Sequence, residues 1–493
     1  MSTPPFVGVE TEYGIAVDGP SEVNPVLASS LVVGAYRDAD DLEVVWDHTD
    51  EHPLRDARGY EHPDPHEPLD DEELGLANTV LTNGARFYVD HAHPEYATPE
   101  CSNARDLVIW DRAGERILEQ AAQQAAARLP AGSRVLVHKN NTDGKGAAYG
   151  THENYLVARS ISFGRLTAAL LPFFVTRPVF AGAGRVGSEL DPRVAFQLTQ
   201  RADFFEVEVG LETTLKRPLM NTRDEPHADP GRYRRLHVIN GDATLCEVAT
   251  LLKVGTMLLV LESIEAGANP VLPTLEDPVA AFHAVSHDLT CRRLLTFADG
   301  SRATALDVQE RYLEAAAAHA RRRGTSPGEE DVLTRWEAVL TTATRDPRAL
   351  AGQVDWATKL QLLEAYRERH GLDWDHDRLK MVDLQYHDVR RDKGLYHRLA
   401  ARGRVERLVS DAEVEAAVST PPVDTRAWFR GECIRRFPTE VVAAGWDALV
   451  FDVGREALQR VPMLDPARGT RALLGEVIDA VDDASTLLER LRG

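Results

Sequence analysis

Two glutamates near the start of the chain, Glu10 and Glu12, have a spacing that suits the binding of a cation. Side chains alternate between the two faces of a strand, so an extended segment here places both carboxylates on one face, opposite Val9 and Thr11. Neighbouring carboxylates repel each other unless a positive group lies between them, and a divalent cation is the usual solution for oxygen ligands. Taken alone, the pair is explained equally well by a solvated edge strand with two exposed acids.

A second group of reactive side chains lies in residues 83–100. The aromatic and branched residues before Asp90 favour a strand, in which Tyr88 and Asp90 face the same side. Pro94 is expected to end this strand, because proline has no backbone N–H to donate. A purely structural strand end does not need so many acids and imidazoles. They are Asp90, His91, His93, Glu95 and Glu100.

Two later segments add imidazole and guanidinium groups. His152 and Asn154 share one face of an extended segment, and strand alternation likewise aligns Arg235 with His237. Arginine beside histidine suits phosphate, because a guanidinium group can donate to two phosphate oxygens at once. A single histidine in a strand is more often a hydrogen-bonded core residue, but four polar clusters on strands of one chain favour a shared site.

Strands framed by long helices must position these groups. Helical spacing of apolar residues, stopped by Pro130 and Gly132, predicts a helix over residues 105–129. The pattern as a whole predicts an α+β fold with a curved antiparallel sheet and packed helices. Other helices are expected at 306–322, 331–344, 356–370 and 470–491, and strands at 6–17, 83–90, 134–138, 154–163, 204–210 and 234–239.

Length and composition indicate a large globular protein with two domains. The chain has 493 residues, of which 43% are hydrophobic, and this exceeds one ordinary domain. The segment Ser-Thr-Pro-Pro-Val at 419–423 is expected to link a large domain, residues 1–420, to a small C-terminal domain, residues 421–493. The net charge of −22 argues against binding of nucleic acid, which draws on a basic surface.

Cysteine usage and hydropathy predict a cytoplasmic protein. The four cysteines lie far apart and have no CxxC spacing, which is typical of reduced thiols. No N-terminal signal is recognisable, and the longest apolar runs, around 166–175 and 251–260, are too short to span a bilayer. We therefore expect no membrane association, and a monomer.

Four motifs together resemble the family of Pup ligase and Pup deamidase/depupylase. They are Gly-Val-Glu-Thr-Glu-Tyr-Gly at 8–14, Tyr-Val-Asp-His-Ala-His-Pro-Glu-Tyr at 88–96, Thr-His-Glu-Asn-Tyr at 151–155 and Arg-Leu-His-Val-Ile-Asn-Gly-Asp at 235–242. The similarity continues through residues 354–359, 383–388 and 429–433, so it covers nearly the whole chain. It implies a large domain with the fold of glutamine synthetase and the carboxylate-amine ligases.

The resemblance leaves a choice between forming and hydrolysing the isopeptide bond that joins a lysine to the C-terminal glutamate of the small protein Pup. Residues 36–78 are rich in Asp, Glu, His and Pro and lack a long apolar period, which predicts a mobile acidic loop. This segment is similar to an insertion that the deamidase/depupylase carries and the ligase lacks. We therefore expect a hydrolase that deamidates the C-terminal glutamine of Pup and releases Pup from its targets.

Three alternatives stay open at this point. The loop at 36–78 can be a passive insertion without a part in the mechanism. The chain can be a Pup–protein ligase that consumes ATP for each bond it forms. It can also be a catalytically inactive adaptor that binds Pup, although the retained acids and imidazoles argue against that.

The resemblance also implies cofactors and their ligands. ATP, or ADP with phosphate, is expected to stay bound with Mg²⁺ without being consumed at each turnover. Trp446 is expected to pack on the adenine, with an ordinary core tryptophan as the alternative. Candidate metal ligands are Glu10, Glu12, Glu95, His152 and His237, and candidate phosphate ligands are Arg201, Arg235, His152 and His237.

Asp90 is expected to be the central catalytic residue. It can attack the scissile amide carbonyl directly, or act as a base for water or bound phosphate. Tyr88 lies on the same strand face, where it can orient Asp90 or donate a hydrogen bond to the oxyanion. Pup and pupylated proteins are the expected partners.

Overall fold

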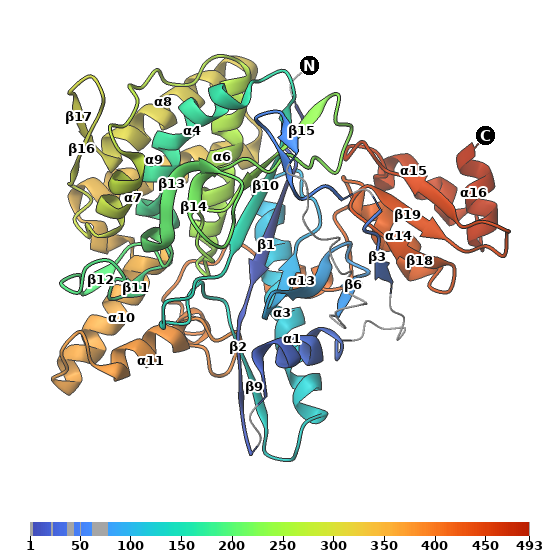
Figure 1. The fold of residues 1–493 in the computed structure, drawn as a ribbon, viewed down its shortest axis with the longest axis horizontal. Helices are drawn as coiled ribbons and strands as arrows, with labels where there is room; N and C mark the ends of the chain where they lie inside the picture. The colour runs from blue at the N-terminus through green and yellow to red at the C-terminus, as the bar shows by residue number, and fades with distance from the viewer. Residues whose placement is uncertain (1–2, 21–22, 37–43, 50, 62–76, 493) are drawn as a thin grey trace.

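A six-stranded antiparallel sheet forms the centre of the protein in this computed structural model, which describes residues 3–20, 23–36, 44–49, 51–61 and 77–492 (Figure 1). The strands lie in the order β15, β10, β1, β8, β7, β6. The predicted α+β class with an antiparallel sheet is confirmed. The strand bounds are β1 Val7–Glu12, β6 Asn78–Val80, β7 Arg86–Asp90, β8 His93–Ala97, β10 Thr151–Ala158 and β15 Tyr233–Val238.

The two faces of this sheet differ in chemistry. In β7, Phe87 and Val89 are buried in the main hydrophobic core, while Arg86, Tyr88 and Asp90 face the other way and are only partly buried. The apolar face packs against helices, drawn at the left and centre of Figure 1. The polar face is therefore free to carry a site. The helices that contact this sheet are α1 Pro25–Val33, α3 Ala104–Ala127 and α6 Glu247–Glu265. Behind α6 pack α8 Ala305–Arg323 and α9 Pro327–Arg345, and α4 Phe163–Thr176 packs on α8.

The prediction that Pro94 ends a strand is wrong. Pro94 lies within β8 and pairs with Val89, and the two strands are joined by a turn at His91 and Ala92. His91 has a φ of 52°, the left-handed conformation that a tight hairpin turn requires. The Pro94 carbonyl oxygen accepts a hydrogen bond from the Tyr13 backbone N–H (3.0 Å), so the proline still contributes to the packing of the backbone.

The long helices were predicted correctly, whereas the ends of some strands and helices were not. The helices expected at 105–129, 306–322, 331–344 and 356–370 are present as α3, α8, α9 and α10 (Asp355–His370). The strand expected at 154–163 starts earlier and stops at Ala158, because Ser162 caps the first turn of α4. The helix expected at 470–491 is two helices, since Asp483 accepts from the Thr486 backbone N–H and starts a new one.

The N-terminal strand expected at 6–17 is also two strands, β1 and β2 (Gly14–Asp18). After Tyr13 the chain leaves the central sheet, and β2 pairs with β9 (Arg134–His138) in a separate ribbon that projects at the bottom of Figure 1.

The remaining elements are β4 Arg55–Asp56, β5 Tyr60–Glu61, α5 Pro178–Ala181, β11 Arg185–Val186, β12 Phe196–Gln197, η1 Ala202–Phe204, β13 Phe205–Gly210, β14 Arg217–Asn221, α7 Pro278–Ser286, β16 Leu294–Thr296, β17 Arg302–Thr304, η2 Pro347–Leu350, α11 Asp377–Tyr386, α12 Leu395–Ala400 and α13 Asp411–Ala417.

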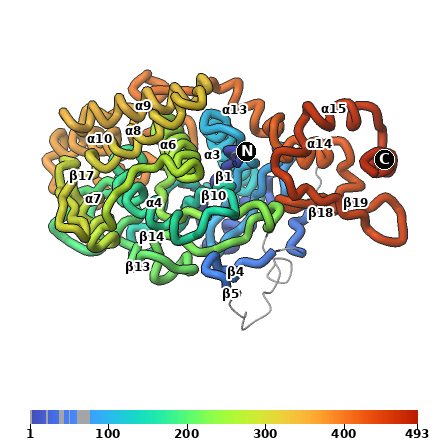
Figure 2. The backbone as a smooth tube through the Cα atoms, turned by 90° about the horizontal axis from the view of Figure 1, so that it is seen from above, coloured from blue at the N-terminus to red at the C-terminus, as the bar shows by residue number. Residues whose placement is uncertain are grey.

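A small C-terminal unit stands beside the central sheet (Figures 1 and 2). Its four-stranded sheet has the order β20, β19, β18, β3, and β3 comes from the segment predicted to be a loop, 36–78. Residues 37–43, 50 and 62–76 of that segment lie outside the described residues, so the mobility of the loop stays a prediction. The elements of the unit are β3 Val45–Trp46, β18 Val441–Ala444, β19 Ala448–Phe451, β20 Gln459–Pro462, α14 Ala427–Arg436, α15 Arg471–Asp479 and α16 Ala484–Arg492.

A buried ion cluster, here called the clamp, ties this unit to the central sheet through Glu100, Arg426 and Arg430. The Glu100 carboxylate accepts from Arg426 Nε (2.7 Å) and from Arg430. Arg430 is fully buried and also donates to the carbonyl oxygens of Gly84 (2.9 Å) and Trp446 (3.1 Å). All three charged groups of the clamp thus have partners within the protein.

No helix in the described part of the chain combines the length and the apolar composition that crossing a bilayer needs.

Candidate active site

The strand register brings the predicted site residues together on the polar face of the central sheet. Glu10 of β1 lies opposite His152 of β10, and Glu12 lies opposite Glu95 of β8. Strand alternation predicted which residues share a face, and cross-strand pairing makes them neighbours. The other pairs on this face are Asn154 with His237 and Tyr88 with Glu95.

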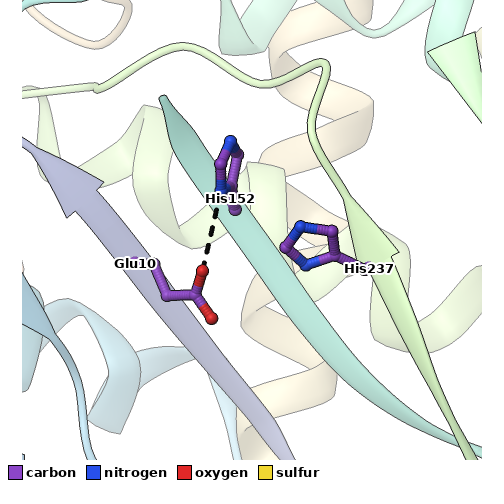
Figure 3. A group of neighbouring side chains, drawn as sticks. All are labelled: Glu10, His152 and His237. Atoms are coloured by element: carbon purple, nitrogen blue, oxygen red, sulfur yellow. Dashed lines mark ion pairs between the residues drawn. The ribbon is translucent and has the colours of Figure 1, made fainter. Parts of the chain in front are cut away.

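Glu10, His152 and His237 form the first of two groups that can hold a cation (Figure 3). One ligand atom from each lies within 4.8 Å of the others. The His152 Nδ1 atom is 3.6 Å from Glu10 Oε2, and the ring centroids of His152 and His237 are 5.0 Å apart.

Asn154 orients this first group from the neighbouring position on β10. Its Nδ2 donates to Glu10 Oε1 (2.8 Å), and its Oδ1 lies 2.9 Å from His237 Nδ1. An amide oxygen only accepts, so His237 carries its proton on Nδ1 and presents Nε2 as a lone pair. That Nε2 atom is buried and has no hydrogen-bond partner among the described residues. A bound cation or phosphate hydroxyl would supply the missing partner.

Glu12, Asp90 and Glu95 form the second group, here called the acid cluster. Their carboxylate oxygens also lie within 4.8 Å of one another. Burial, together with the charges of Asp90 and Glu12, raises the pKa of Glu95 well above its usual value. Glu95 Oε2 is buried without a hydrogen-bond partner in the described part of the structure. Three oxygen donors with excess negative charge fit Mg²⁺, whereas the two imidazoles of the first group suit a softer ion or phosphate.

The prediction placed five metal ligands in one set, and the structure divides them. Glu12 and Glu95 belong to the acid cluster together with Asp90, which was expected to act in catalysis. The sequence does not show this division, because it depends on which residues of different strands lie opposite each other.

Asp90 lies at the end of β7 with its side chain partly exposed. Burial would raise its pKa, but the hydrogen bond and charge of His91 outweigh this and lower the pKa below the usual value. The His91 Nδ1 atom is 3.0 Å from Asp90 Oδ1, and the hydrogen bond to Asp90 raises the pKa of His91 to about 9. Asp90 is therefore ionised at neutral pH and accessible from the site.

Tyr88 lies two residues before Asp90 on the same face and stays a phenol. Burial and the nearby charges of Glu95 and Glu10 raise its pKa well above the usual value. A neutral hydroxyl beside ionised carboxylates can only donate its proton to them or to a substrate oxygen. Its predicted role, to orient Asp90 or bind an oxyanion, is compatible with this state.

Arg235 balances Glu10 at the centre of the sheet. Its NH1 atom lies 3.7 Å from Glu10 Oε1 and donates to Asn154 Oδ1 (3.1 Å). Burial opposes ionisation of Glu10, but its hydrogen bond with His152 and the charges of His237 and Arg235 lower its pKa far below the usual value.

Arg201 is buried and Arg223 is partly buried, and neither forms an ion pair with a carboxylate of the described residues. Arg201 donates to the backbone carbonyl oxygens of Ile239 and Gly241, and burial lowers its pKa to about 10. Arg223 leaves its Nε buried without a hydrogen-bond partner in the described part of the chain. Burial and the charge of Arg235 lower its pKa. Buried guanidinium groups of this kind fit an anion such as phosphate.

A pocket opens beside Glu10 and reaches the C-terminal unit. Glu10, Asn154 and Arg235 line one part, and Trp446 lines another. The Trp446 ring is partly buried and has the Arg430 guanidinium 5.0 Å from its centroid. Trp446 and Arg201 thus lie outside the two ligand groups, and of these two residues Trp446 lines the pocket.

Sequence reasoning missed the parts played by Asn154 and the clamp. Asn154 follows His152 by two residues, which signals a shared face, but its bridging role depends on a third strand. Arg426 and Arg430 lie four residues apart and flank the apolar residues 427–429, and this was the available signal of a buried pair.

Comparison with known proteins gives one consistent result. Residues 5–450 match the family model described as Pup-ligase protein. The chain is 54% identical to the depupylase of Acidothermus cellulolyticus and 50% identical to the Pup deamidase/depupylase of Mycolicibacterium smegmatis, with 99% of each chain covered in both. It is 44% identical to the Pup–protein ligase of Nakamurella multipartita over 82% of this chain and 90% of the ligase.

Two solved structures share its fold. The ligase PafA in complex with Pup aligns with a TM-score of 0.81 and 32% identity, covering 97% of this chain and 92% of that one. PafA in complex with ADP aligns with a TM-score of 0.75 and 34% identity, covering 85% of this chain and 95% of that one.

Proposed function

The chain belongs to the Pup-ligase protein family, and from this premise we propose that it is a Pup deamidase/depupylase. It hydrolyses the side-chain amide of a C-terminal glutamine in Pup, and the isopeptide bond between Pup and a target lysine. The full-length similarity to relatives with that name carries the proposal, since the ligase relative matches less of the chain at lower identity. Pup and pupylated proteins in the cytoplasm are the partners that this activity requires.

A nucleotide with Mg²⁺ is proposed as the cofactor. The ADP complex of a relative supports this, as does the pocket that runs from Trp446 towards Arg235 and Glu10. Glu12 and Glu95 would hold the metal ion, while His237, Arg235 and Arg201 would face the phosphates. When bound, the metal and phosphates would neutralise charge and act as a template and Lewis acid beside the substrate.

Asp90 is the residue that we propose to act on the substrate. An Asp90 oxygen attacks the carbonyl carbon of the scissile amide, the carbon–nitrogen bond breaks, and ammonia or the lysine amine leaves after its nitrogen has taken a proton from water. Water then hydrolyses the resulting anhydride and restores the carboxylate. The lowered pKa of Asp90 keeps its carboxylate ionised, as attack on the carbonyl carbon requires. Tyr88 can donate to the oxyanion.

Release of ammonia tests the function directly. The protein is mixed with Mg²⁺, ATP and Pup that ends in glutamine, and ammonia is measured with and without EDTA. A hydrolase releases ammonia without a matching rise in ADP, and EDTA stops it. Formation of a Pup–protein conjugate together with one ADP would instead identify a ligase. Binding of Pup without either product would identify an adaptor.

Trapping tests the role of Asp90. Hydroxylamine added during turnover should convert an acyl group on Asp90, or the Pup carbonyl, to a hydroxamate that mass spectrometry can locate. A single turnover in H₂¹⁸O should place ¹⁸O in Asp90 in part of the molecules if an anhydride forms. Absence of ¹⁸O from Asp90 after many turnovers would favour the role of base.

A further inference from the structure

Arg86 lies between two aromatic rings at the edge of the site. Its guanidinium carbon is 4.0 Å from the centroid of the Trp46 ring and 4.0 Å from that of Tyr88. Its Nε donates to Asn78 Oδ1 (3.0 Å) on β6, in the position directly opposite Tyr88. A planar guanidinium group stacks well on aromatic faces, so Arg86 is held on both sides and at its Nε atom.

Trp46 has several contacts besides Arg86. It is buried on β3, and its Nε1 donates to Glu51 Oε1 (2.7 Å). The edge of its ring meets Trp446 at a centroid distance of 5.2 Å, and the backbone N–H of Val80 in β6 donates to the Val44 carbonyl oxygen (3.3 Å). Trp46 therefore forms a rigid support, anchored to both the central sheet and the C-terminal unit.

The chemistry proposed above gives Arg86 no direct part, but it needs Tyr88 in one orientation. Tyr88 faces the acid cluster, where it lies directly opposite Glu95 of β8. The ring of a tyrosine is set by two torsion angles, and a flat partner against one face restricts both. Lysine would keep the charge of Arg86 but would lose the planar stack.

We propose that Arg86 is a positioning residue which, supported by Trp46, holds the Tyr88 ring so that its hydroxyl faces the acid cluster. This inference deepens the proposed function and rests on it for its kinetic test. It assigns a part in the reaction to Trp46, which comes from the segment predicted to be a loop.

A double-mutant cycle tests the proposal. Arg86→Met and Arg86→Lys should each lower kcat about tenfold at saturating Pup, while the Kd for Mg–ATP stays within about twofold. In a Tyr88→Phe background Arg86→Met should cost nothing more, because the hydroxyl that it positions is gone. A further tenfold loss in that background would overturn the proposal.

Two further variants separate positioning from folding. Trp46→Phe keeps an aromatic face and should retain at least a third of kcat, whereas Trp46→Ala should lose as much as Arg86→Met and add nothing to it. Arg322→Met, on an exposed part of α8, is the matched control and should behave as wild type. Equal losses for Trp46→Phe and Trp46→Ala would argue against a stacking role.

A spectroscopic measurement keeps the inference testable if the chain proves inactive. The protein is labelled with 3-fluorotyrosine, and the Tyr88 signal among the 12 tyrosines is assigned with Tyr88→Phe. Arg86→Met should shift and broaden that ¹⁹F resonance, whereas Arg322→Met should leave it unchanged. An unaltered Tyr88 resonance in Arg86→Met would overturn the proposal, while lack of ammonia release by the wild type would overturn only the function.

Discussion

Two clusters of charged residues adjoin the central sheet, and they differ in how their charges are satisfied. In the clamp, the Glu100 carboxylate lies between two guanidinium groups, whose remaining contacts are backbone carbonyl oxygens. In the acid cluster, three carboxylates adjoin one another, and Glu95 has an oxygen without a hydrogen-bond partner in the described residues. The clamp is complete within the protein, and the acid cluster is not.

This difference indicates that the clamp stabilises the fold, whereas the acid cluster binds a ligand. A buried charge without a partner costs free energy, so a fold retains such groups where a ligand completes them. A satisfied cluster needs no ligand, and breaking it harms the fold instead. Substitutions in the acid cluster should therefore reduce activity, and substitutions in the clamp should reduce stability.

The largest effect is expected at Asp90. Asp90→Asn keeps the shape and removes the charge, so ammonia release should fall by about a thousandfold or more while the protein still binds Mg–ATP. Denaturant unfolding should show only a small change in stability, because the variant loses the ion pair with His91 as well as the repulsion from the neighbouring carboxylates. Asp482→Asn, at an exposed position, is the control. Full activity of Asp90→Asn would remove Asp90 from the chemistry.

The clamp should give the opposite result. Arg430→Met leaves the carboxylate of Glu100 with one cation instead of two and removes the contacts to Gly84 and Trp446. Breaking a buried ion pair costs about 3–5 kcal/mol, which chemical denaturation should detect. Arg322→Met serves again as the exposed control. An unchanged unfolding free energy would mean that the clamp is not structural.

Acid should weaken the clamp over a defined range of pH. Burial opposes ionisation of Glu100, but Arg430 and Arg426 outweigh it and lower its pKa from 4.5 to about 2. A lowered pKa stabilises the fold at pH values above 4.5, and this stabilisation, about 3 kcal/mol, is lost as the pH falls towards 2. Glu100→Gln should thus be less stable than wild type at pH 7, and the difference should shrink by pH 3. A constant difference would contradict this assignment.

The smallest effect is expected from Glu95→Gln, and its sign is informative. Without metal, replacing the Glu95 carboxyl group, whose pKa is raised, should leave the free energy of unfolding unchanged or raise it by about 1 kcal/mol. With Mg–ATP, the thermal stabilisation seen in wild type should diminish, because a metal ligand has been lost. Thermal unfolding with EDTA and with Mg–ATP measures both. A variant stabilised by Mg–ATP as strongly as wild type would place the metal elsewhere.

Local sequence pattern accounts for much of this site, and tertiary pairing for the rest. Alternation within one strand was enough to predict that Glu10 and Glu12 share a face, as do Tyr88 and Asp90. Register between strands is set by contacts distant in sequence, so the division into two ligand groups could not be predicted. The same holds for Arg430, whose burial depends on a carboxylate 330 residues away.

The pairing of β3 with β18 has a consequence for any attempt to divide the protein. Ala444 of β18 lies opposite Trp46 of β3 in a parallel strand pair, so one edge strand of the C-terminal sheet comes from a segment about 400 residues earlier in the chain. A fragment cut near residue 420 would expose the open edge of β18 and invite aggregation. Two separately produced halves should instead need each other to become soluble.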